Sequence, residues 1–395
     1  MQLERGISTK PLYASYSKTV QGIYRHRQAL RTPSPLTVTM QWALLLLLAS
    51  LAQPCLSYSR NSLYWLSHLR SRHGYGYRNG YPASQWNTEN PESDCPLECD
   101  CPGLYPRAMY CHSRNLQHVP FVPSRMKYVY LHNNQIASIK EGVFDNATDL
   151  VWIIMHKNQL TSDKIAKKVF SKLKNLQKLY LNSNSLTVIP EDLPTSLVDL
   201  RLNNNKITKL SDDTFKDMVD LSHLNLHGNA IKEVGGAFKG LDSLTVLDLS
   251  RNSLEKVPAS LPQDLQQLYL NFNQITSVPG NFLSNYPTLR YVRLSHNLLT
   301  DNGIPSSAFN TTSLLELDLS HNRLERIPTI STKLENLYLQ ANHIKEFSLG
   351  SFCRVVDMAN FSQIRVLRLD GNEISTRDVP PEAVLCLRLA VSIDL

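Results

Sequence analysis

The chain has 395 residues, 42% of them hydrophobic, and a formal net charge of +7. Residues 1–57 contain six basic side chains and one acidic one, so the rest of the chain has 41 − 6 = 35 basic and 34 − 1 = 33 acidic residues. This near-neutral balance gives no support for nucleic-acid binding, which requires basic charge concentrated on a folded face, and we expect no nucleic-acid partner.

A signal peptide is predicted near the N-terminus. The run Trp42–Ala52 is uncharged and ends in small residues; its eleven residues are too few to span a bilayer but enough for a signal-peptide core. Met40 directly precedes this run, so we expect residues 1–39 to be an upstream leader or an alternative start, and residues 40–57 to be the signal peptide. The pattern predicts a secreted chain without membrane insertion.

The cleavage position depends on the cysteines. Seven cysteines are an odd number for an oxidising compartment, where unpaired thiols are unusual. Cleavage after Ser57 removes Cys55 and leaves six cysteines, whereas cleavage after Ala52 leaves a free thiol. The sequence favours Ser57 and leaves Ala52 open.

The next segment, residues 58–94, is rich in tyrosine and arginine and has no acidic residue before Glu89. We expect a solvated, disordered tail. The alternative is a basic aromatic segment that contacts anionic glycosaminoglycans.

Four closely spaced cysteines define a predicted N-terminal cap over residues 95–125. Their spacing is Cys95-x3-Cys99-x-Cys101-x9-Cys111. Without a cap, the first of the repeats that follow would expose an apolar face to solvent. A small disulfide-bonded hairpin can cover that face. A zinc site is the alternative; secretion, and a cysteine pair split by a single residue, favour disulfides. The pairing within the cap stays open.

Residues 126–374 repeat the pattern LxxLxLxxNxL eleven times. Most intervals between the asparagines are 20 to 26 residues, and the last is 30. Self-similarity at this period is typical of a leucine-rich-repeat solenoid, in which each unit buries its apolar face by stacking on its neighbours. These ladder asparagines are Asn134, Asn158, Asn184, Asn205, Asn229, Asn252, Asn273, Asn297, Asn322, Asn342 and Asn372.

Within each unit, two leucines separated by one residue predict a short strand with one buried face. Between Leu247 and Leu249, for example, Asp248 is expected to face outward. The ladder asparagine can donate and accept at once, and so can satisfy backbone groups where the chain leaves the strand. Proline-broken return segments exclude full helices. We therefore expect a β-dominated α/β horseshoe, with a curved parallel sheet on the concave face and short extended or 3-10 segments on the convex side.

The residue between the two strand leucines forms an exposed column on the predicted sheet. Eleven strands at ~4.8 Å spacing make an arc roughly 50 Å long, which suits an extended polar partner. The alternative is that the tyrosines only cover their neighbours and that arginine and aspartate neutralise one another. The column comprises Tyr130, Ile154, Tyr180, Arg201, Asn225, Asp248, Tyr269, Arg293, Asp318, Tyr338 and Arg368.

The C-terminal end departs from the period. Cys353 and Cys386 accompany the long interval before Asn372, and a disulfide between them would close a loop of about 30 residues and stabilise the chain by a few kcal/mol. We expect this interval, near residues 342–372, to be an enlarged repeat, and residues 375–395 to form a C-terminal cap.

Three N-x-Ser/Thr sequons lie between predicted strands, where a glycan would not block the sheet. N-glycosylation is therefore predicted at Asn146, Asn310 and Asn360.

No catalytic arrangement is evident in the sequence. His296 and His321 each lie in Ser-His-Asn, near acids such as Asp318, but at variable places within a structural repeat. The sequence contains no nucleophile elbow, phosphate loop or metal-binding helix. We expect no enzyme activity, no cofactor and no metal site.

Residues 95–395 resemble the small leucine-rich proteoglycans, in the class that contains fibromodulin, lumican and keratocan. The resemblance rests on the four-cysteine cap, the number of repeats and the long repeat with Cys353 and Cys386. It implies a secreted extracellular-matrix proteoglycan that binds fibrillar collagen of type I or II and regulates fibril assembly and diameter. It also implies sequestration of transforming growth factor β and keratan sulfate on asparagine. A homodimer paired through the concave faces stays open.

The resemblance also implies a collagen contact through a Glu and a Lys in a terminal Gly-Asn-Glu-Ile-Lys segment. Glu373 matches that Glu, but Ser375 stands in place of the Lys, and Arg377 can substitute only if the backbone turns it inward. Tails in this class carry tyrosines among acids, so the acid-free tail here argues against tyrosine sulfation. The collagen-binding hypothesis comprises Glu373, Arg368, Arg293, Asp318, Asp248, Arg201, Tyr269 and Tyr338.

A second function stays open. A soluble leucine-rich-repeat protein that recognises growth factors or microbial products would present the same exposed column. Collagen binding discriminates between the two functions.

Overall fold

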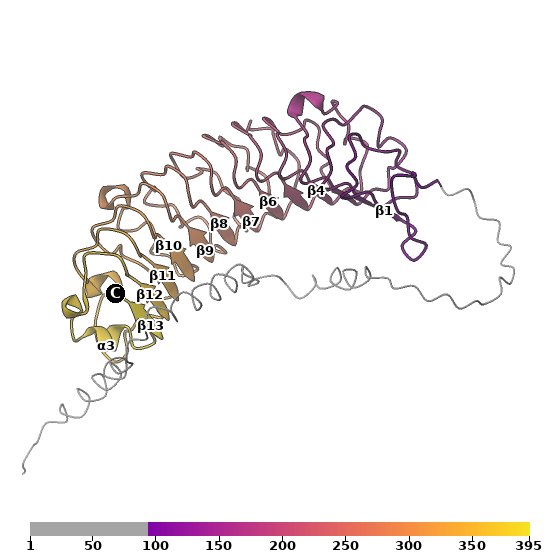
Figure 1. Ribbon diagram of the computed structural model, residues 1–395. Helices are drawn as coiled ribbons and strands as arrows, with labels where there is room; N and C mark the ends of the chain where they lie inside the picture. The colour runs from indigo at the N-terminus through magenta and orange to yellow at the C-terminus, as the bar shows by residue number, and fades with distance from the viewer. Residues whose placement is uncertain (1–93) are drawn as a thin grey trace, which may run out of the picture. The chain divides into compact units, whose positions relative to one another are not determined.

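The computed structural model describes residues 94–395, which form a solenoid whose turns each add one short strand to a single sheet (Figure 1). The strands lie side by side along the concave face, and the connecting segments make up the convex side. The predicted leader 1–39, the signal peptide 40–57 and nearly all of the tail fall outside the described residues and remain predictions. No helix of the part described is long and apolar enough to cross a membrane.

The sheet is parallel, and its strands follow one another in chain order with neighbouring strands in register. The leucine-rich-repeat horseshoe predicted from the period is therefore confirmed. The strands are β1 (Ala108–Tyr110), β2 (Tyr128–Tyr130), β3 (Trp152–Ile154), β4 (Lys178–Tyr180), β5 (Asp199–Arg201), β6 (His223–Asn225), β7 (Val246–Asp248), β8 (Gln267–Tyr269), β9 (Tyr291–Arg293), β10 (Glu316–Asp318), β11 (Asn336–Tyr338), β12 (Val366–Arg368) and β13 (Ser392–Asp394).

The sheet has thirteen strands in the described chain, two more than the eleven repeats predict. The additional strands come from the caps: β1 pairs with β2, and β13 pairs with β12. An end strand of a sheet presents unpaired N–H and C=O groups, which a cap satisfies by pairing as a further strand. In the N-terminal cap, Met109 and Cys111 occupy the two leucine positions and are fully buried.

The core consists of one leucine-rich stack that runs the length of the solenoid. Leu247 and Leu249 of β7 are 0% exposed, as the alternation predicts. On the convex side, buried phenylalanines continue the stack, with the rings of Phe144 and Phe170 5.9 Å apart. Each turn thus buries its apolar side chains only against its neighbours, as expected for a solenoid.

The ladder asparagines satisfy backbone groups of two successive turns. Asn252 Nδ2 donates to the carbonyls of Leu226 and Leu249, each at 3.0 Å, and its Oδ1 accepts the N–H of Ile231 at 3.0 Å. The first and last ladder asparagines bond in the same way. The side chain therefore joins turns as well as closing one.

Short helical turns interrupt the otherwise extended convex side. They are η4 (Ser162–Lys164), η5 (Asp301–Gly303), η6 (Leu349–Ser351), η7 (Thr376–Asp378) and α3 (Ala383–Cys386). Isolated parallel bridges such as Ile139 with Ile165 link neighbouring connections. The prediction that the return path holds no full helix is confirmed for the described repeats.

Two disulfides hold the N-terminal cap. They join Cys95 to Cys101 and Cys99 to Cys111, so all four cysteines are used and the zinc alternative is excluded. Cys111 follows β1 directly, so its bond to Cys99 anchors the cap to the edge of the sheet.

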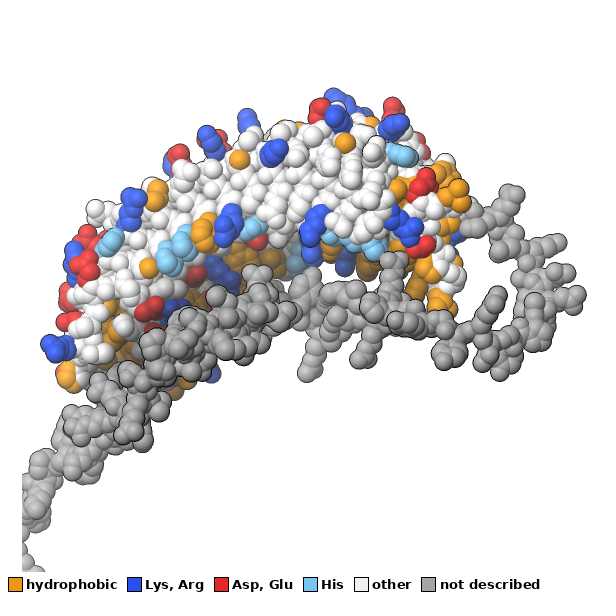
Figure 2. Space-filling model, viewed as in Figure 1, with side chains coloured by type: hydrophobic (Ala, Val, Ile, Leu, Met, Phe, Trp, Pro, Cys, Tyr) orange, Lys and Arg blue, Asp and Glu red, His pale blue; other side chains and the backbone are white. Residues whose placement is uncertain are grey.

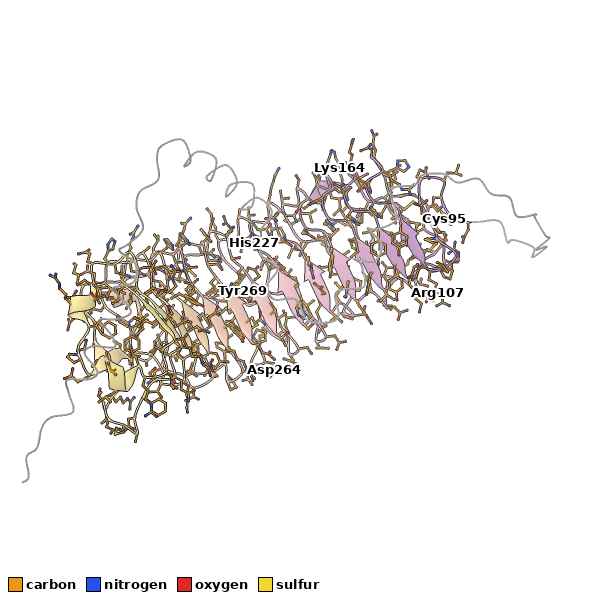
Figure 3. All side chains as sticks on the ribbon, turned by 60° about the horizontal axis from the view of Figure 1, so that its bottom comes forward. Cys95, Arg107, Lys164, His227, Asp264 and Tyr269 are labelled. Carbon is orange, nitrogen blue, oxygen red and sulfur yellow. A yellow bond between two sulfur atoms is a disulfide. The ribbon has the colours of Figure 1, made fainter. Side chains whose placement is uncertain are left out.

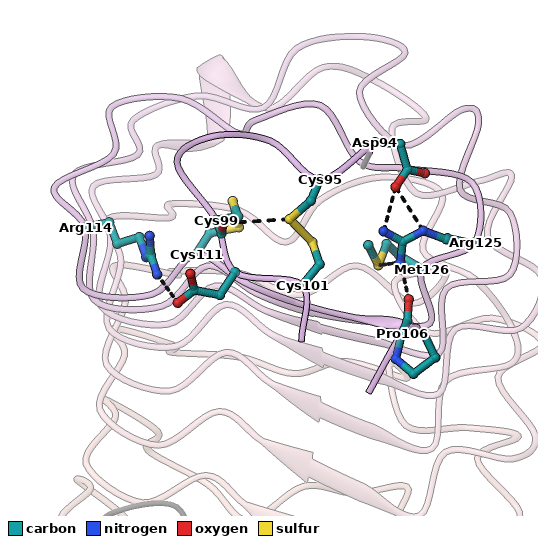
Figure 4. Close-up of a disulfide and its surroundings, with 10 residues drawn as sticks. Asp94, Cys95, Cys99, Cys101, Pro106, Cys111, Arg114, Arg125 and Met126 are labelled. Atoms are coloured by element: carbon teal, nitrogen blue, oxygen red, sulfur yellow. Dashed lines mark hydrogen bonds and ion pairs between the residues drawn. A yellow bond between two sulfur atoms is a disulfide. The ribbon is translucent and has the colours of Figure 1, made fainter. Parts of the chain in front are cut away.

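Arginines that follow β1 hold the cap together (Figure 4). Arg125 donates from Nε to Asp94 at 2.9 Å and also bonds the carbonyl of Pro106. Arg114 pairs with Asp100. The segment before β1 is thereby held against the first turn.

At the other end, Cys353 and Cys386 form the predicted disulfide. It ties the enlarged repeat to α3, and the N–H of Ser362 donates to the carbonyl of Cys386 at 2.8 Å. Both cysteines are buried, at 4% and 0% exposure.

Candidate functional site

The predicted column exists as one continuous row on the concave sheet. Strand register places Asp248 beside Tyr269, Tyr269 beside Arg293, and Arg293 beside Asp318. Tyr338 and Arg368 continue the row on β11 and β12. Figure 3 shows Tyr269 on the open face of the sheet, between His227 at one edge and Asp264 at the other. Six of the eight predicted residues are thus adjacent.

Arg201 lies on the same row but two strands away from Asp248. Asn225 of β6 stands between them in register. Ile154 departs from the prediction, because it is buried at 7% exposure rather than presented to solvent. Its neighbours in the row are Tyr130 and Tyr180, whose larger side chains flank it on both sides.

A second row on the concave face comes from the first residue of each strand. It brings Asp199 to Arg201, whose guanidinium pairs with the carboxylate at 3.1 Å and stacks 4.2 Å from the Tyr180 ring. It also brings Glu316 to Arg293, at 3.0 Å. The sequence analysis did not identify Asp199 and Glu316 as partners of the arginines. Strand alternation could have indicated that they lie on the concave face, because residues two apart on a strand share a face.

Arg368, the last arginine of the row, is also paired. It bonds Asp370 at 2.9 Å and lies 3.8 Å from Asp394 of β13. All three arginines of the row are therefore paired with carboxylates, but with acids outside the row rather than with Asp248 or Asp318. The tyrosines are half-buried, and burial raises the pKa of the Tyr269 phenol.

The two ends of the concave face differ in charge. Strands β9 to β13, together with Asp370 two residues past the end of β12, present two arginines and four carboxylates, so this end has a net charge of 2 − 4 = −2. These residues are Arg293, Glu316, Asp318, Arg368, Asp370 and Asp394. Strands β1 to β4 present aromatic side chains and one cation, Lys178, which lies 4.4 Å from the Trp152 ring.

Glu373 does not lie on the row. It follows the ladder asparagine of its turn and contacts His343 Nδ1 at 3.8 Å, at the edge where the strands end. Ser375 and Asp378 form a capping box at η7. Arg377 is exposed within η7. The predicted terminal contact and the strand row are therefore two different surfaces.

The sequon asparagines are all exposed and lie between strands. Asn310 and Asn360 line one cavity of about 590 Å³ beside the enlarged repeat, together with Phe352. The Asn360 side chain donates to Asp357 Oδ2 at 2.7 Å. Their glycosylation remains a prediction.

Three histidines stack at the end of the first strands. The His132 ring lies 4.7 Å from that of His112 and 4.6 Å from that of His156. Burial, followed by the nearby His156, His112 and Lys157, lowers the pKa of His132 to about 4. His132 is thus neutral in the folded chain at pH 7.

This stack predicts acid sensitivity. Folding lowers the pKa of His132 from about 6.5 in the unfolded chain to about 4. Between these two pH values the unfolded chain binds more protons at this residue than the folded chain does. The free energy of unfolding therefore falls as the pH drops through this window. Lowering the pH from 7 to 4.5 should cost about 1–2 kcal/mol through this group, allowing for its partial exposure. In urea titrations His132→Phe should show a smaller loss between the two pH values. An unchanged pH dependence would contradict this assignment.

Comparison with known proteins supports the same architecture. A family model for leucine-rich repeats matches residues 124–186, 195–254 and 263–324, and one for the leucine-rich-repeat N-terminal domain matches residues 94–123. Among solved structures, a chain of the octameric complex of Latrophilin 3, Unc5D and FLRT2 (LRR) is 28% identical, with a TM-score of 0.54, over 70% of this chain and 77% of that chain.

Matrix proteoglycans are far more similar in sequence. Fibromodulin from Bos taurus is 54% identical over 376 residues, which cover 90% of this chain and all of that protein. Fibromodulin from Homo sapiens is 52% identical over 378 residues with the same coverage. Human lumican is 45% identical over 324 residues, covering 82% of this chain and 95% of that protein.

Proposed function

Because the chain belongs to the small leucine-rich proteoglycans, in the family of fibromodulin and lumican, we propose that it is a secreted extracellular-matrix protein that binds fibrillar collagen and regulates the assembly and diameter of fibrils. Proteins of this family are structural, and the chain is not an enzyme.

The observation that carries this proposal is the uninterrupted row from Asp248 to Arg368. It spans six adjacent strands, β7 to β12, and so extends over about 24 Å at the usual strand spacing. Tyrosine and arginine are the side chains that most often dominate binding energy at protein interfaces. A rod such as collagen can lie along such a row without a deep pocket.

Charge supports the C-terminal half of the row as the contact. The net charge of −2 over β9 to β13 suits basic side chains of a fibrillar partner, and complementary charge raises association rates. Each arginine there already holds a carboxylate, so the charged groups are oriented before a partner arrives.

Collagen fibril formation tests this proposal. The protein should slow the rise in turbidity of type I collagen and reduce fibril diameter in electron micrographs. Arg293→Ala should weaken collagen binding by about five-fold, because it removes a central arginine and leaves Glu316 without its partner. Lys239→Ala on the convex side is the matched control, since Lys239 is exposed and remote from the sheet.

Glu373→Ala separates the two candidate surfaces. A loss only in that variant would move the contact to the edge near His343, and wild-type binding by both variants would refute both assignments. If the unaltered protein neither binds collagen nor changes fibril diameter, the collagen function is wrong and recognition of soluble ligands takes its place.

Family membership also supports three finer properties: sequestration of transforming growth factor β, keratan sulfate on Asn146, Asn310 or Asn360, and pairing of two solenoids. The exposure of the three asparagines is compatible with glycans there. Mass spectrometry before and after keratanase treatment tests the second property.

A further inference from the structure

The edge of the sheet where the strands end has an unusual charge distribution. We define the rim as the two residues that flank each ladder asparagine. Around the first ten ladder asparagines, Asn134 to Asn342, these twenty residues include no Asp or Glu. They include the cations Lys157, Lys206, Arg251 and Arg323. The concave rows beside the rim, in contrast, carry both signs of charge.

The rim cations are available to a partner. Lys157, Lys206, Arg251 and Arg323 are all exposed, and none forms an ion pair within residues 94–395. The arginines of the concave row are all paired with carboxylates. The first acid on the rim is Glu373, in the last turn.

Part of the rim is preorganised by stacking. The guanidinium of Arg251 lies 4.1 Å from the Phe272 ring, and the rings of Phe272, His296 and His321 follow at 4.0 Å each. All four residues have φ between 52° and 56°, so their shared left-handed turn repeats the same side-chain placement from turn to turn. Figure 2 shows basic and histidine side chains in a row along this edge. Stacking restrains Arg251 before any ligand binds, which lowers the entropy lost on binding.

Three of the four rim cations are evenly spaced. Lys157, Lys206 and Arg251 follow β3, β5 and β7, so they recur at every second turn, and Arg323 follows β10. Two strand spacings amount to about 10 Å. In a linear glycosaminoglycan the pattern of anionic groups repeats with each disaccharide, that is, every two sugar rings, a comparable length.

Acidic groups near the rim are few or already engaged. Glu325, two residues outward from Arg323, pairs with Lys345 at 3.3 Å, and Asp301 lies 3.5 Å from Arg326. Glu255 lies outward of Arg251 and has no ion pair within the described chain. A polyanion that follows the rim therefore meets mainly positive or neutral groups.

We propose that the rim from Lys157 to Arg323 binds a linear sulfated glycosaminoglycan. This goes beyond collagen binding, because it uses the edge of the sheet rather than its concave row. Attraction between a polyanion and exposed cations is screened by salt, so the affinity should fall steeply as ionic strength rises.

Heparin binding by the full chain tests the proposal. Immobilised heparin should retain the unaltered protein, and a heparin dodecasaccharide should compete. The double variant Lys157→Glu/Lys206→Glu should weaken binding by about ten-fold or more, since each exposed charge pair contributes roughly two- to five-fold and reversal adds repulsion. The matched control Lys216→Glu/Lys239→Glu reverses two exposed lysines of the convex side and should stay within about two-fold of the unaltered protein.

Two further comparisons sharpen the result. Phe272→Ala removes the platform of Arg251 without changing charge, and should weaken heparin binding by about two-fold to three-fold. Hyaluronan, which has carboxylates but no sulfates, should compete far less well than heparin.

Heparin binding unchanged in the rim double variant would overturn the proposal, as would equal competition by hyaluronan. The collagen turbidity assay keeps the outcomes distinct, because the rim double variant should retain its effect on fibrils. A failure of collagen binding by the unaltered protein would leave the heparin result unaffected.

Discussion

Asn252→Asp is expected to lower the free energy of unfolding by about 4 kcal/mol, because the substitution removes buried donors from two successive turns. Asn252 is 8% exposed, and its Nδ2 supplies the carbonyls of Leu226 and Leu249. An aspartate keeps the acceptor for Ile231 but turns a second oxygen towards those carbonyls. The loss combines unsatisfied carbonyls with a buried charge.

Urea unfolding followed by circular dichroism measures this loss. Asn271→Asp is the matched control, because Asn271 lies in the next turn, is half-exposed, and forms no side-chain hydrogen bond within the described chain. The control should change stability by less than about 0.5 kcal/mol. Equal losses in both variants would mean that the ladder contributes no more than an ordinary surface asparagine.

Removing the C-terminal disulfide is the second large effect. Cys353→Ala/Cys386→Ala should cost about 4 kcal/mol, because the bond closes a loop with a sequence separation of 33 and its loss frees that loop in the unfolded chain. In a solenoid each turn contacts only its neighbours, so the enlarged repeat should open before the central turns.

Limited proteolysis together with urea unfolding measures both parts of this prediction. Cleavage should appear first between residues 354 and 362, with the central repeats still protected. Cys95→Ala/Cys101→Ala, which opens a loop of separation 6, should cost less, about 2.5 kcal/mol. A C-terminal variant as stable as the unaltered chain would show that packing of the buried cap, not the covalent bond, holds that end.

The sequence was sufficient for the repeat and its strands because burial is local and periodic. The alternation of Leu247, Asp248 and Leu249 predicts which side chain faces out, and the structure agrees. The same reasoning failed for Ile154, because exposure depends on the size of neighbours in other turns. The count of strands was low because β1 and β13 carry only part of the pattern.

The sequence predicted the row of the candidate site but not the partners of its arginines. The row from Asp248 to Arg368 could be read from one position per repeat. Asp199 lies two residues from Arg201 in the same strand, so alternation alone could have indicated that pair. Glu316 pairs with Arg293 of the preceding strand, which follows from register between turns of unequal length. Glu373 was matched to a terminal motif and not to the row, and its position at the sheet edge beside His343 is visible only in the structure.

By itself the sequence determined the solenoid, its buried leucines, the ladder asparagines and the two groups of cysteines, because each follows from spacing within a single repeat. Only the tertiary structure decided how the turns stack: which cysteines pair in the cap, that Glu316 holds Arg293 of the preceding strand, and that Arg251, Phe272, His296 and His321 form one column. In that column, the side-chain groups of residues 20 or more positions apart in the sequence come within 4 Å to 5 Å of one another. Such contacts depend on the turn-to-turn register, which no single repeat contains.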